Sequence, residues 1–404
     1  MLNQHTLREA TRLTQAGQLT EATALLQRMF RGEGAPAAAS AASAASAAPG
    51  RMRLPGRTPP IIDLEANDVG EADRVAPAAA PTAAPPRGRP LIDRAKDGTW
   101  LGMRGVKRAP ASMTEIAPEG AKFIEGTYSN KAGSRTYKLF VPQGYHQSQP
   151  LPLIVMLHGC TQSPDDFAAG TRMNFIAEER NCLVVYPAQR GDANPSKCWN
   201  WFRSADQQRD AGEPSLIAGI TRQVMRDYSV DPARVFVAGL SAGGAAAAIM
   251  GATYGDLYAA VGIHSGLAYG AATDMPSAFA AMRQGSGARR RADSRGPTVP
   301  SIIFHGDRDS TVNPVNGTQA LEQATGAART KKKTQRGQIP GGHSYTRTTH
   351  ADGEREILEH WNIHGAGHAW SGGSPAGSYT DPQGPDATKE MLRFFLENPH
   401  PQQS

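Results

Sequence analysis

The sequence predicts an α/β fold in which helices cover both faces of a mostly parallel sheet. Short continuous apolar runs are typical of strands that are buried on both faces. Such runs occur at residues 151–157, 182–186, 235–240, 259–263 and 301–304. Helix-type segments lie between these runs, and this alternation favours parallel strands joined by right-handed crossovers.

The helices between the strands are expected at residues 165–179, 214–227, 242–251 and 315–324. Before the first buried strand, polar and apolar residues alternate over 122–128 and 134–141, which is a β-hairpin pattern. A second hairpin is expected at 344–350 and 355–363, on either side of the turn signal Ala351-Asp-Gly353. A last helix over residues 386–396 closes the domain.

The composition divides the chain into three parts. Residues 116–398 form the predicted α/β domain. Residues 32–115 are rich in Pro and Ala and poor in large apolar side chains, so we expect a disordered linker. Residues 1–31 are expected to form an amphipathic helical hairpin that is too small for a core of its own. Such a hairpin suits self-association or tethering to a partner or hydrophobic surface.

Charge and cysteine content restrict the class of protein. The net charge is +6, but the basic runs Arg289–Arg291 and Lys331–Lys333 are expected in solvated loops, so we predict no nucleic-acid partner. Neither a signal peptide nor a transmembrane segment is expected, because the polar start of the chain precedes no apolar stretch and the longest uncharged stretch is mostly Gly and Ala. Three cysteines allow at most one internal disulfide. A cytoplasmic location is expected, with an extracellular one as the alternative.

The segment 235–250 contains the most informative motif, Gly239-x-Ser241-x-Gly243. A β-type run precedes the motif and an alanine-rich helical run follows it, which is the strand–turn–helix context of a nucleophile elbow. The glycines meet the steric demand of the sharp turn. We therefore expect the turn to point the Oγ of a nucleophilic Ser241 outward, after the middle strand of an α/β-hydrolase architecture.

An elbow serine needs a carboxylate and a histidine, which follow it in the order Ser, Asp or Glu, His. The predicted strand 301–304 runs into His305-Gly-Asp-Arg-Asp309, and two aspartates compete there. We favour Asp309 over Asp307 because it fits the pattern His-Gly-x-x-Asp-x-x-Val. The alternative for either residue is a turn-capping side chain.

His368 is the expected base, because it lies in a glycine-flanked loop after the last strand. His364, four residues earlier, is its rival. The other histidines after strands, namely His158, His264 and His305, are expected in supporting or turn positions. His343 and His350 are expected to be solvated side chains of a surface hairpin.

The oxyanion hole needs two backbone N–H groups, and Ala242 supplies one of them from the start of the elbow helix. The loop after the predicted strand 151–157 supplies the second, for which Cys160 is the natural donor. Cys160 as a nucleophile lacks an elbow and is disfavoured. Pairing of Cys160 with Cys198, in an oxidising environment, would join two loops beside the serine.

Seven spaced segments resemble the poly(3-hydroxybutyrate) depolymerase-type esterases, which are close to acetyl-xylan and feruloyl esterases. They are LHGCTQ at 157–162, YPAQ at 186–189, CWNWF at 198–202, GLSAGG at 239–244, HSG at 264–266, GAGHAWSGG at 365–373 and YTDPQGPD at 379–386. The resemblance implies a serine esterase with the triad Ser241, Asp309 and His368, and oxyanion amides at Cys160 and Ala242. It implies no metal or cofactor.

Four aromatic residues lie in the segments around the expected site: Trp199, Trp201, Trp370 and Tyr379. They are expected either to pack the loops or to form an apolar wall for an acyl chain or a sugar ring. The expected substrates are short hydroxyalkanoate esters or oligomers, with acetyl-xylan or feruloyl esters as the alternative. The alternative from another class is a granule- or surface-binding protein. The sequence leaves the acyl group, the oligomeric state and the role of the hairpin open.

Overall fold

A computed structural model of the chain describes residues 111–286, 299–326 and 330–401. Within these ranges, ten strands form one large sheet and two short strands form a second. The strands of the large sheet are β1 (Lys122–Asn130), β2 (Gly133–Val141), β3 (Leu151–Leu157), β4 (Leu183–Pro187), β5 (Val230–Leu240), β6 (Ala260–His264), β7 (Ser301–Gly306), β8 (Lys331–Gln338), β9 (Ser344–Asp352) and β10 (Arg355–His364). The short strands are β11 (Trp370–Ser371) and β12 (Thr380–Asp381).

The helices connect these strands along the chain. They are α3 (Met113–Ile116), α4 (Pro164–Thr171), α5 (Met173–Glu179), the 3₁₀ helix η3 (Ser204–Gln207), α6 (Gly212–Asp227), α7 (Ala242–Thr253), α8 (Met275–Gln284), α9 (Val315–Thr325) and α10 (Ala387–Glu397). Side chains cap several of them, as at Asp386, whose carboxylate accepts the Lys389 N–H at the start of α10.

The strand order is β1-β2-β4-β3-β5-β6-β7-β10-β9-β8. The six central strands, β4, β3, β5, β6, β7 and β10, are parallel to one another. An antiparallel hairpin extends each edge, with β1–β2 beside β4 and β8–β9 beside β10. Parallel strands end at the same edge of a sheet. The loops after β3, β5, β7 and β10 therefore meet at one edge, where ligands bind in open α/β sheets.

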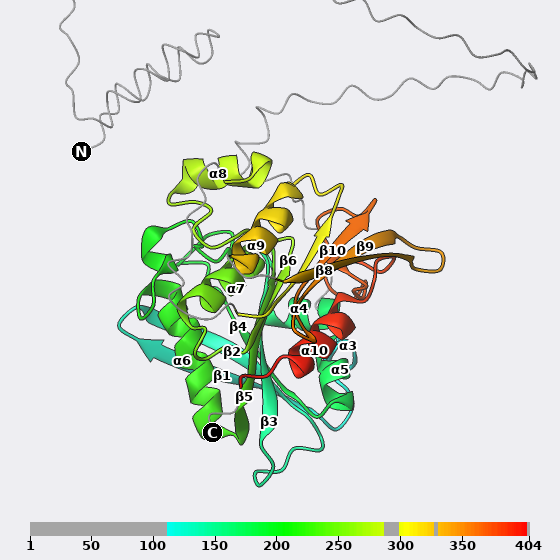
Figure 1. The fold of residues 1–404 in the computed structure, drawn as a ribbon. Helices are drawn as coiled ribbons and strands as arrows, with labels where there is room; N and C mark the ends of the chain where they lie inside the picture. Colours follow the sequence, from blue (N-terminus) through cyan, green and yellow to red (C-terminus); the bar gives the residue numbers. More distant parts are fainter. Residues whose placement is uncertain (1–110, 287–298, 327–329, 402–404) are drawn as a thin grey trace, which may run out of the picture. The chain divides into compact units, whose positions relative to one another are not determined.

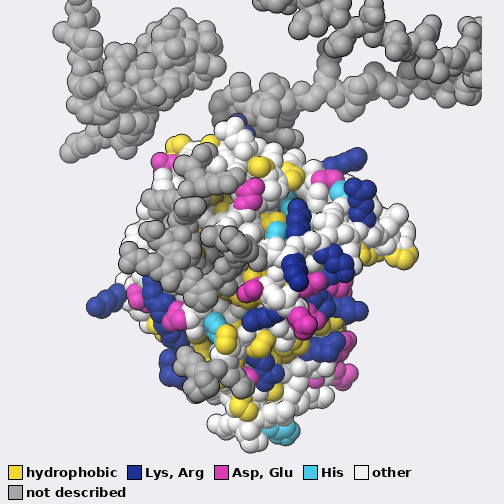
Figure 2. All heavy atoms as spheres, viewed as in Figure 1, with side chains coloured by type: hydrophobic (Ala, Val, Ile, Leu, Met, Phe, Trp, Pro, Cys, Tyr) yellow, Lys and Arg dark blue, Asp and Glu magenta, His cyan; other side chains and the backbone are white. Residues whose placement is uncertain are grey.

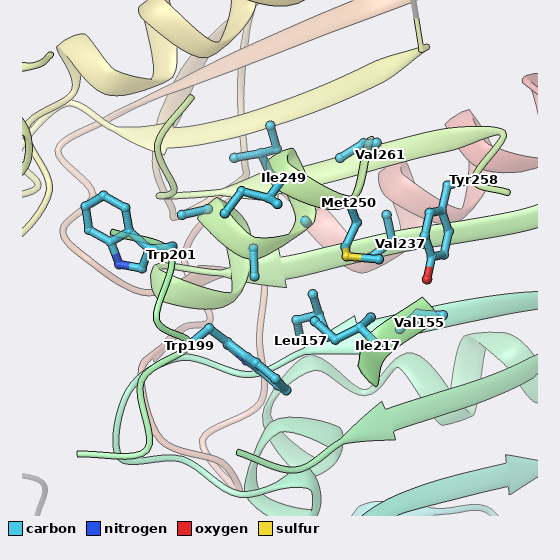
Figure 3. Packing of buried hydrophobic residues seen from close by; sticks show 14 of the residues in the cluster. Val155, Leu157, Trp199, Trp201, Ile217, Val237, Ile249, Met250, Tyr258 and Val261 are labelled. Atoms are coloured by element: carbon cyan, nitrogen blue, oxygen red, sulfur yellow. The ribbon is translucent and has the colours of Figure 1, made fainter. Parts of the chain in front are cut away.

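Two hydrophobic cores lie on opposite faces of the sheet. In β3, whose residues are all buried, Val155 and Leu157 belong to one core and Ile154 and Met156 to the other. Helices α6, α7, α8 and α9 cover the first face, and α3, α4, α5 and α10 cover the second (Figure 1). Figure 3 shows the first core, where side chains of β3, β5 and β6 meet those of α6 and α7.

The structure confirms both hairpins and every predicted buried strand, with ends that shift by a few residues. The single helix predicted over 165–179 is wrong, because the chain breaks into α4 and α5 at Arg172. That residue has a left-handed backbone with φ 55°. The Thr171 hydroxyl donates to the Phe167 carbonyl in the last turn of the first helix.

Lys331–Lys333 lies in a strand, and the predicted loop is wrong. The run opens β8, an exposed edge strand that pairs with β9 from Lys331 to Gln338. The other basic run, Arg289–Arg291, lies outside the described residues. On the face shown in Figure 2, basic side chains are interspersed with acidic ones.

The predicted helical hairpin at 1–31 and nearly all of the predicted linker lie outside the described residues. Helix α3 (Met113–Ile116) belongs to the folded domain, because Ile116 is 2% exposed and its carbonyl accepts the Asn174 amide at 2.9 Å. The domain therefore begins ahead of residue 116. Among the described helices, none has the length and apolarity that crossing a membrane requires.

Candidate active site

Ser241 lies at the sharp turn between β5 and α7. Its backbone has φ 58° and ψ −117°, which is rare for a residue other than glycine and marks a strained position. A Cβ at Gly239 would collide with the Gly243 carbonyl, and one at Gly243 would collide with the Leu157 carbonyl. The two glycines therefore let the turn pass close to β3. The expected elbow is present.

Ser241 is 7% exposed, and its hydroxyl has no hydrogen-bond partner among the described residues. Ser241 is the N-cap residue of α7, but its side chain makes no capping hydrogen bond. Its backbone N–H instead donates to the His264 carbonyl at the end of β6, at 2.9 Å. The backbone therefore fixes where the Ser241 side chain lies, at the end of β5.

Asp309 and His368 are brought together by the loops after β7 and β10. His368 Nδ1 lies 2.7 Å from Asp309 Oδ2, and both side chains are largely buried. The hydrogen bond fixes which ring nitrogen faces the carboxylate, so Nε2 is the nitrogen available for proton transfer. His368 Nε2 is buried and has no hydrogen-bond partner among the described residues. No hydrogen bond joins it to Ser241 in the described structure.

Asp309 is held as a carboxylate by four neighbours. Its Oδ1 accepts the N–H groups of Thr311 and Val312, at 2.9 and 2.8 Å. The Nε2 atom of His305 lies 3.4 Å from Oδ2, beside the shorter bond to His368. Burial alone raises the pKa of the Asp309 carboxyl, but the bonds from His305 and His368 outweigh burial and lower it. A stable negative charge therefore faces the His368 ring.

The rival pair, Asp307 and His364, bind each other. His364 Nδ1 lies 2.9 Å from Asp307 Oδ2, and His364 Nε2 lies 2.9 Å from the Thr346 hydroxyl. Asp307 Oδ1 also accepts the Gly365 N–H at 2.7 Å. Both side chains are more than a third exposed, unlike Asp309 and His368. This pair therefore anchors the start of the loop that carries His368.

The remaining strand-end histidines have supporting positions. His158 accepts the Gln189 N–H through Nε2, and burial lowers its pKa to about 4. His264 accepts the Ser371 N–H and stacks on Trp370, and burial lowers its pKa to about 3. Both rings are therefore neutral near pH 7. No group of three or more His, Cys, Asp or Glu in the described ranges could hold a metal ion.

His343 and His350 differ from the solvated side chains that the sequence predicted. His343 Nε2 lies 2.8 Å from Asp381 Oδ2, and His350 Nδ1 lies 2.9 Å from the Thr330 hydroxyl. Both residues are partly buried because the hairpin β9–β10 is the continuation of the large sheet. The residue pattern over 344–363 predicted the hairpin but did not indicate which side chains contact His343 and His350.

The loop after β3 presents the Cys160 amide. Neither the Cys160 N–H nor the Ala242 N–H has an acceptor among the described residues, so both are free to bind an oxyanion. Gln162 steadies the loop, because its Oε1 accepts the Gly159 N–H at 2.9 Å. A disulfide joins Cys160 to Cys198, and Cys182 is the free, buried cysteine.

The four aromatic residues differ in burial. Trp199 and Trp370 are 0% and 1% exposed, and their indole N–H groups bond to the His158 carbonyl and the Thr388 hydroxyl. The structure shows these two rings as packing residues; Trp199 lies at the edge of the first core (Figure 3). Trp201 is buried beside Phe202. Tyr379 is partly exposed, with its hydroxyl 3.1 Å from that of Thr161. Substrate contact stays a prediction.

Glu213 is a supporting residue that the sequence analysis missed. This buried carboxylate at the start of α6 accepts the Asn200 N–H and side-chain amide, both at 2.7 Å, and the Gln189 amide. Arg135 Nη2 lies 3.4 Å from Glu213 Oε1. Burial raises the pKa of the Glu213 carboxyl. The network ties the loop 198–201 to α6. A glutamate at a helix start is ordinary in sequence, so no signal marked it.

Comparisons with known proteins agree with this geometry. Residues 135–330 match the family described as Esterase PHB depolymerase. Poly(3-hydroxyalkanoate) depolymerase C of Paucimonas lemoignei is 33% identical over 238 residues, which are 56% of each chain. Feruloyl esterase B of Neurospora crassa is 28% identical over 221 residues, 51% of this chain and 74% of that protein.

A solved acetyl xylan esterase from Aspergillus awamori superposes with a TM-score of 0.54 at 20% identity, covering 68% of this chain and 99% of that one. This likeness shows the fold, which is that of the α/β-hydrolases. The match spans about half the length of the depolymerases, 56% for the Paucimonas protein and 48% for one from Ralstonia pickettii. Residues 135–330 thus match the esterase PHB depolymerase family, and the chain is similar to depolymerases and esterases over about half of its length.

Proposed function

We propose that this protein is a serine esterase that hydrolyses carboxylic esters through Ser241, Asp309 and His368. One observation carries the proposal: a buried Asp309–His368 pair lies at the sheet edge where the elbow presents the free Ser241 hydroxyl. The family match and the curated esterase relatives support the same reaction class.

In the proposed mechanism, Ser241 Oγ attacks the ester carbonyl while His368 Nε2 takes its proton. Asp309 holds the imidazole by its Nδ1–H and stabilises the imidazolium. The amides of Cys160 and Ala242 bind the oxyanion that forms. His368 then protonates the leaving alcohol, and water, activated by the same ring, hydrolyses the acyl-enzyme.

For the substrate, we propose short hydroxyalkanoate esters or their oligomers. The 33% identity to a poly(3-hydroxyalkanoate) depolymerase supports this class. A sugar ester is the second candidate, because the match to feruloyl esterase B covers more of that relative, 74% of its length. The same triad and oxyanion amides can hydrolyse both classes of ester. The residues that line the substrate site therefore decide which class is preferred.

The test is a hydrolysis panel with purified wild type and Ser241→Ala. The panel runs from p-nitrophenyl acetate to octanoate and includes hydroxybutyrate oligomers, acetylated xylan and methyl ferulate. We expect hydroxybutyrate oligomers to give the highest kcat/KM and Ser241→Ala to abolish all hydrolysis. Higher kcat/KM on a xylan or ferulate ester would favour the second candidate. Unchanged hydrolysis by Ser241→Ala would sink the esterase assignment at this site.

The disulfide bears on location. Disulfides persist in oxidising compartments and are rare in the cytosol. The Cys160–Cys198 bond therefore supports the extracellular alternative over the cytoplasmic expectation, and we propose an oxidising compartment. Labelling of free thiols in the protein from its native source tests this: one reactive thiol per unfolded chain is expected, and three would contradict it.

We also propose that residues 1–31 mediate self-association of the enzyme or tether it to a hydrophobic surface. The apolar stripe in the sequence supports this role. Replacing Leu7, Leu13 and Leu25 by Ser in the full chain should leave kcat on a soluble ester unchanged. It should reduce self-association, measured by analytical ultracentrifugation, or binding to polymer particles. Unchanged assembly and unchanged particle binding would contradict the proposal.

A further inference from the structure

We infer that the His158 ring aims one N–H of the oxyanion hole, because it holds the carbonyl oxygen on the other side of the same peptide group. The inference rests on the proposed esterase function and concerns a side chain outside the triad. It makes His158 a positioning residue, which acts on the reacting oxygen through the peptide between Gly159 and Cys160.

The hydrogen bonds of His158 show which ring nitrogen carries the proton. Its Nε2 lies 3.1 Å from the backbone N of Gln189, and a backbone N–H can only donate, so Nε2 is an acceptor. Burial lowers the pKa of His158 to about 4, so the ring is neutral near pH 7 and its one proton is on Nδ1. Nδ1 lies 2.7 Å from the Gly159 carbonyl oxygen and therefore donates to it.

The Gly159 carbonyl belongs to the peptide group that carries the Cys160 N–H. A trans peptide group is planar, and its C=O and N–H bonds point in opposite directions. Among the described residues no peptide bond is cis. A fixed Gly159 oxygen therefore fixes the direction of the Cys160 N–H, for which the described residues provide no acceptor.

A second hydrogen bond reaches the Gly159 oxygen, and it is the weaker one. The backbone N of Gln162 lies 3.4 Å from this oxygen, which is longer than the usual range, against 2.7 Å for His158 Nδ1. Because residue 159 is a glycine, it offers little steric resistance to rotation of the peptide that follows it. We therefore expect loss of the His158 donor to let this peptide turn.

His158 itself is held rigidly at the end of β3. It is 1% exposed, and its carbonyl accepts the indole N–H of buried Trp199 at 3.2 Å. The two rings lie against each other, with centroids 5.7 Å apart. Gln189, whose N–H binds Nε2, is anchored by its side-chain amide to the Cys198 carbonyl at 2.9 Å. The ring is thus part of the scaffold and transmits that rigidity to the peptide.

The peptide that follows Gly159 starts beside the nucleophile. A Cβ on Gly159 would lie only 3.7 Å from the Cβ of Ser241. An oxyanion donor contributes when it is aimed in advance at the developing charge. A turned peptide would present the carbonyl oxygen of Gly159 in place of the Cys160 N–H, and would repel the oxyanion.

Two substitutions in the full chain separate the roles of the two ring nitrogens. His158→Asn has an amide N–H near the position of Nδ1, so it keeps the bond to the Gly159 carbonyl and loses the acceptor for Gln189. His158→Gln has an amide oxygen near the position of Nε2, so it keeps the acceptor for Gln189 and loses the donor to Gly159. Each variant removes one hydrogen bond from a buried ring, so each is the control for the packing of the other.

Steady-state kinetics on a soluble p-nitrophenyl ester compare the variants with the wild type. We expect His158→Gln to lower kcat about tenfold to hundredfold with KM changed less than about twofold, because the donor acts in the transition state. The conservative variant His158→Asn should keep kcat within about threefold of the wild type. Near-UV circular dichroism gives the folded fraction to which each kcat is referred. Equal losses of kcat, or a larger loss in His158→Asn, would overturn the inference.

Two further measurements address the aim of the donor directly. A trifluoromethyl ketone forms a serine adduct whose oxygen occupies the oxyanion hole, so its affinity should fall in parallel with kcat/KM in His158→Gln. An unchanged affinity would overturn the inference. The ring ¹⁵N chemical shifts of wild-type His158 at pH 7 need no variant: a proton on Nδ1 is expected, and a proton on Nε2 would contradict the inference. Absence of ester hydrolysis by the wild type would instead overturn the proposed function.

Discussion

Two aspartates, two residues apart, have different environments at the sheet edge. Asp309 is buried, receives two backbone N–H groups and bonds to His368. Asp307 is more than a third exposed and bonds to His364 and to the backbone at Gly365. Only Asp309 combines burial with a bond to a buried ring, so only it can hold a fixed charge against the imidazolium.

The roles of the two carboxylates can be separated by neutral isosteres. We predict that Asp309→Asn lowers kcat by about 10³–10⁴, because the amide favours the wrong imidazole tautomer. Asp307→Asn should cost less than about tenfold, since the amide still accepts the Gly365 N–H. Steady-state kinetics on a soluble ester measure both, with circular dichroism as the control for folding. A larger loss in Asp307→Asn would reverse the assignment.

At this scale the sequence predicted where the candidate residues lie better than it predicted their packing. The residues flanking Ser241, Asp309 and His368 pointed to their places after β5, β7 and β10. The burial of Trp199 and Trp370 depends on contacts with distant segments, such as Thr388 on α10, that spacing along the chain does not encode. The partners of Glu213 were invisible for the same reason.

Among the elements, β8 is one of the two edges of the large sheet and carries three successive lysines. Edge strands expose unpaired N–H and C=O groups that can pair with another chain, and lysines oppose such pairing. Lys331, Lys332 and Lys333 are exposed. We therefore expect the basic run to protect this edge of the sheet.

Replacing Lys331, Lys332 and Lys333 together by Val should promote edge-to-edge association, because the charge barrier is removed from a β-prone strand. We expect rising light scattering at concentrations where the wild type stays clear, with kcat per folded molecule unchanged. The matched control replaces the same residues by Arg and keeps the charge. Equal scattering of the Val and Arg variants would show that charge does not protect β8.

The elements with the clearest patterns were predicted best. Strands such as β3 are continuously apolar because both faces are buried, and the hairpin turns carry glycine. The sequence did not predict helix α8, and it predicted one helix where the structure has α4 and α5. The break at Arg172 uses a left-handed residue other than glycine, so local sequence gave no warning. Tertiary contacts decide such positions.

For the whole molecule, buried neutral histidines link folding to pH. Burial lowers the pKa of His158 to about 4, that of His264 to about 3 and that of His360 to about 4. In the unfolded chain these rings titrate near 6.5. Between about pH 6.5 and 4 the unfolded chain therefore binds more protons, and stability falls as the pH falls. Above pH 6.5 these three histidines do not make the stability depend on pH.

We predict that the free energy of unfolding, measured with guanidinium chloride, decreases steadily as the pH falls from 6.5 to 4.5. Between pH 6.5 and 8, the contribution of these histidines to the free energy of unfolding should stay constant. His158 alone accounts for about 3 kcal/mol over its full shift. His158→Asn keeps a donor for the Gly159 carbonyl and cannot titrate, so its slope should be shallower. Equal slopes for the two proteins would contradict the assignment of His158.

The central claim is that Ser241 is the nucleophile, and its most direct test is covalent labelling. Wild type treated with a fluorophosphonate should gain one adduct by intact mass, and peptide mapping should place the adduct on Ser241. His368→Ala should react far more slowly, since the base that activates the hydroxyl is gone. An adduct on another residue, or rapid labelling of Ser241→Ala, would contradict the account.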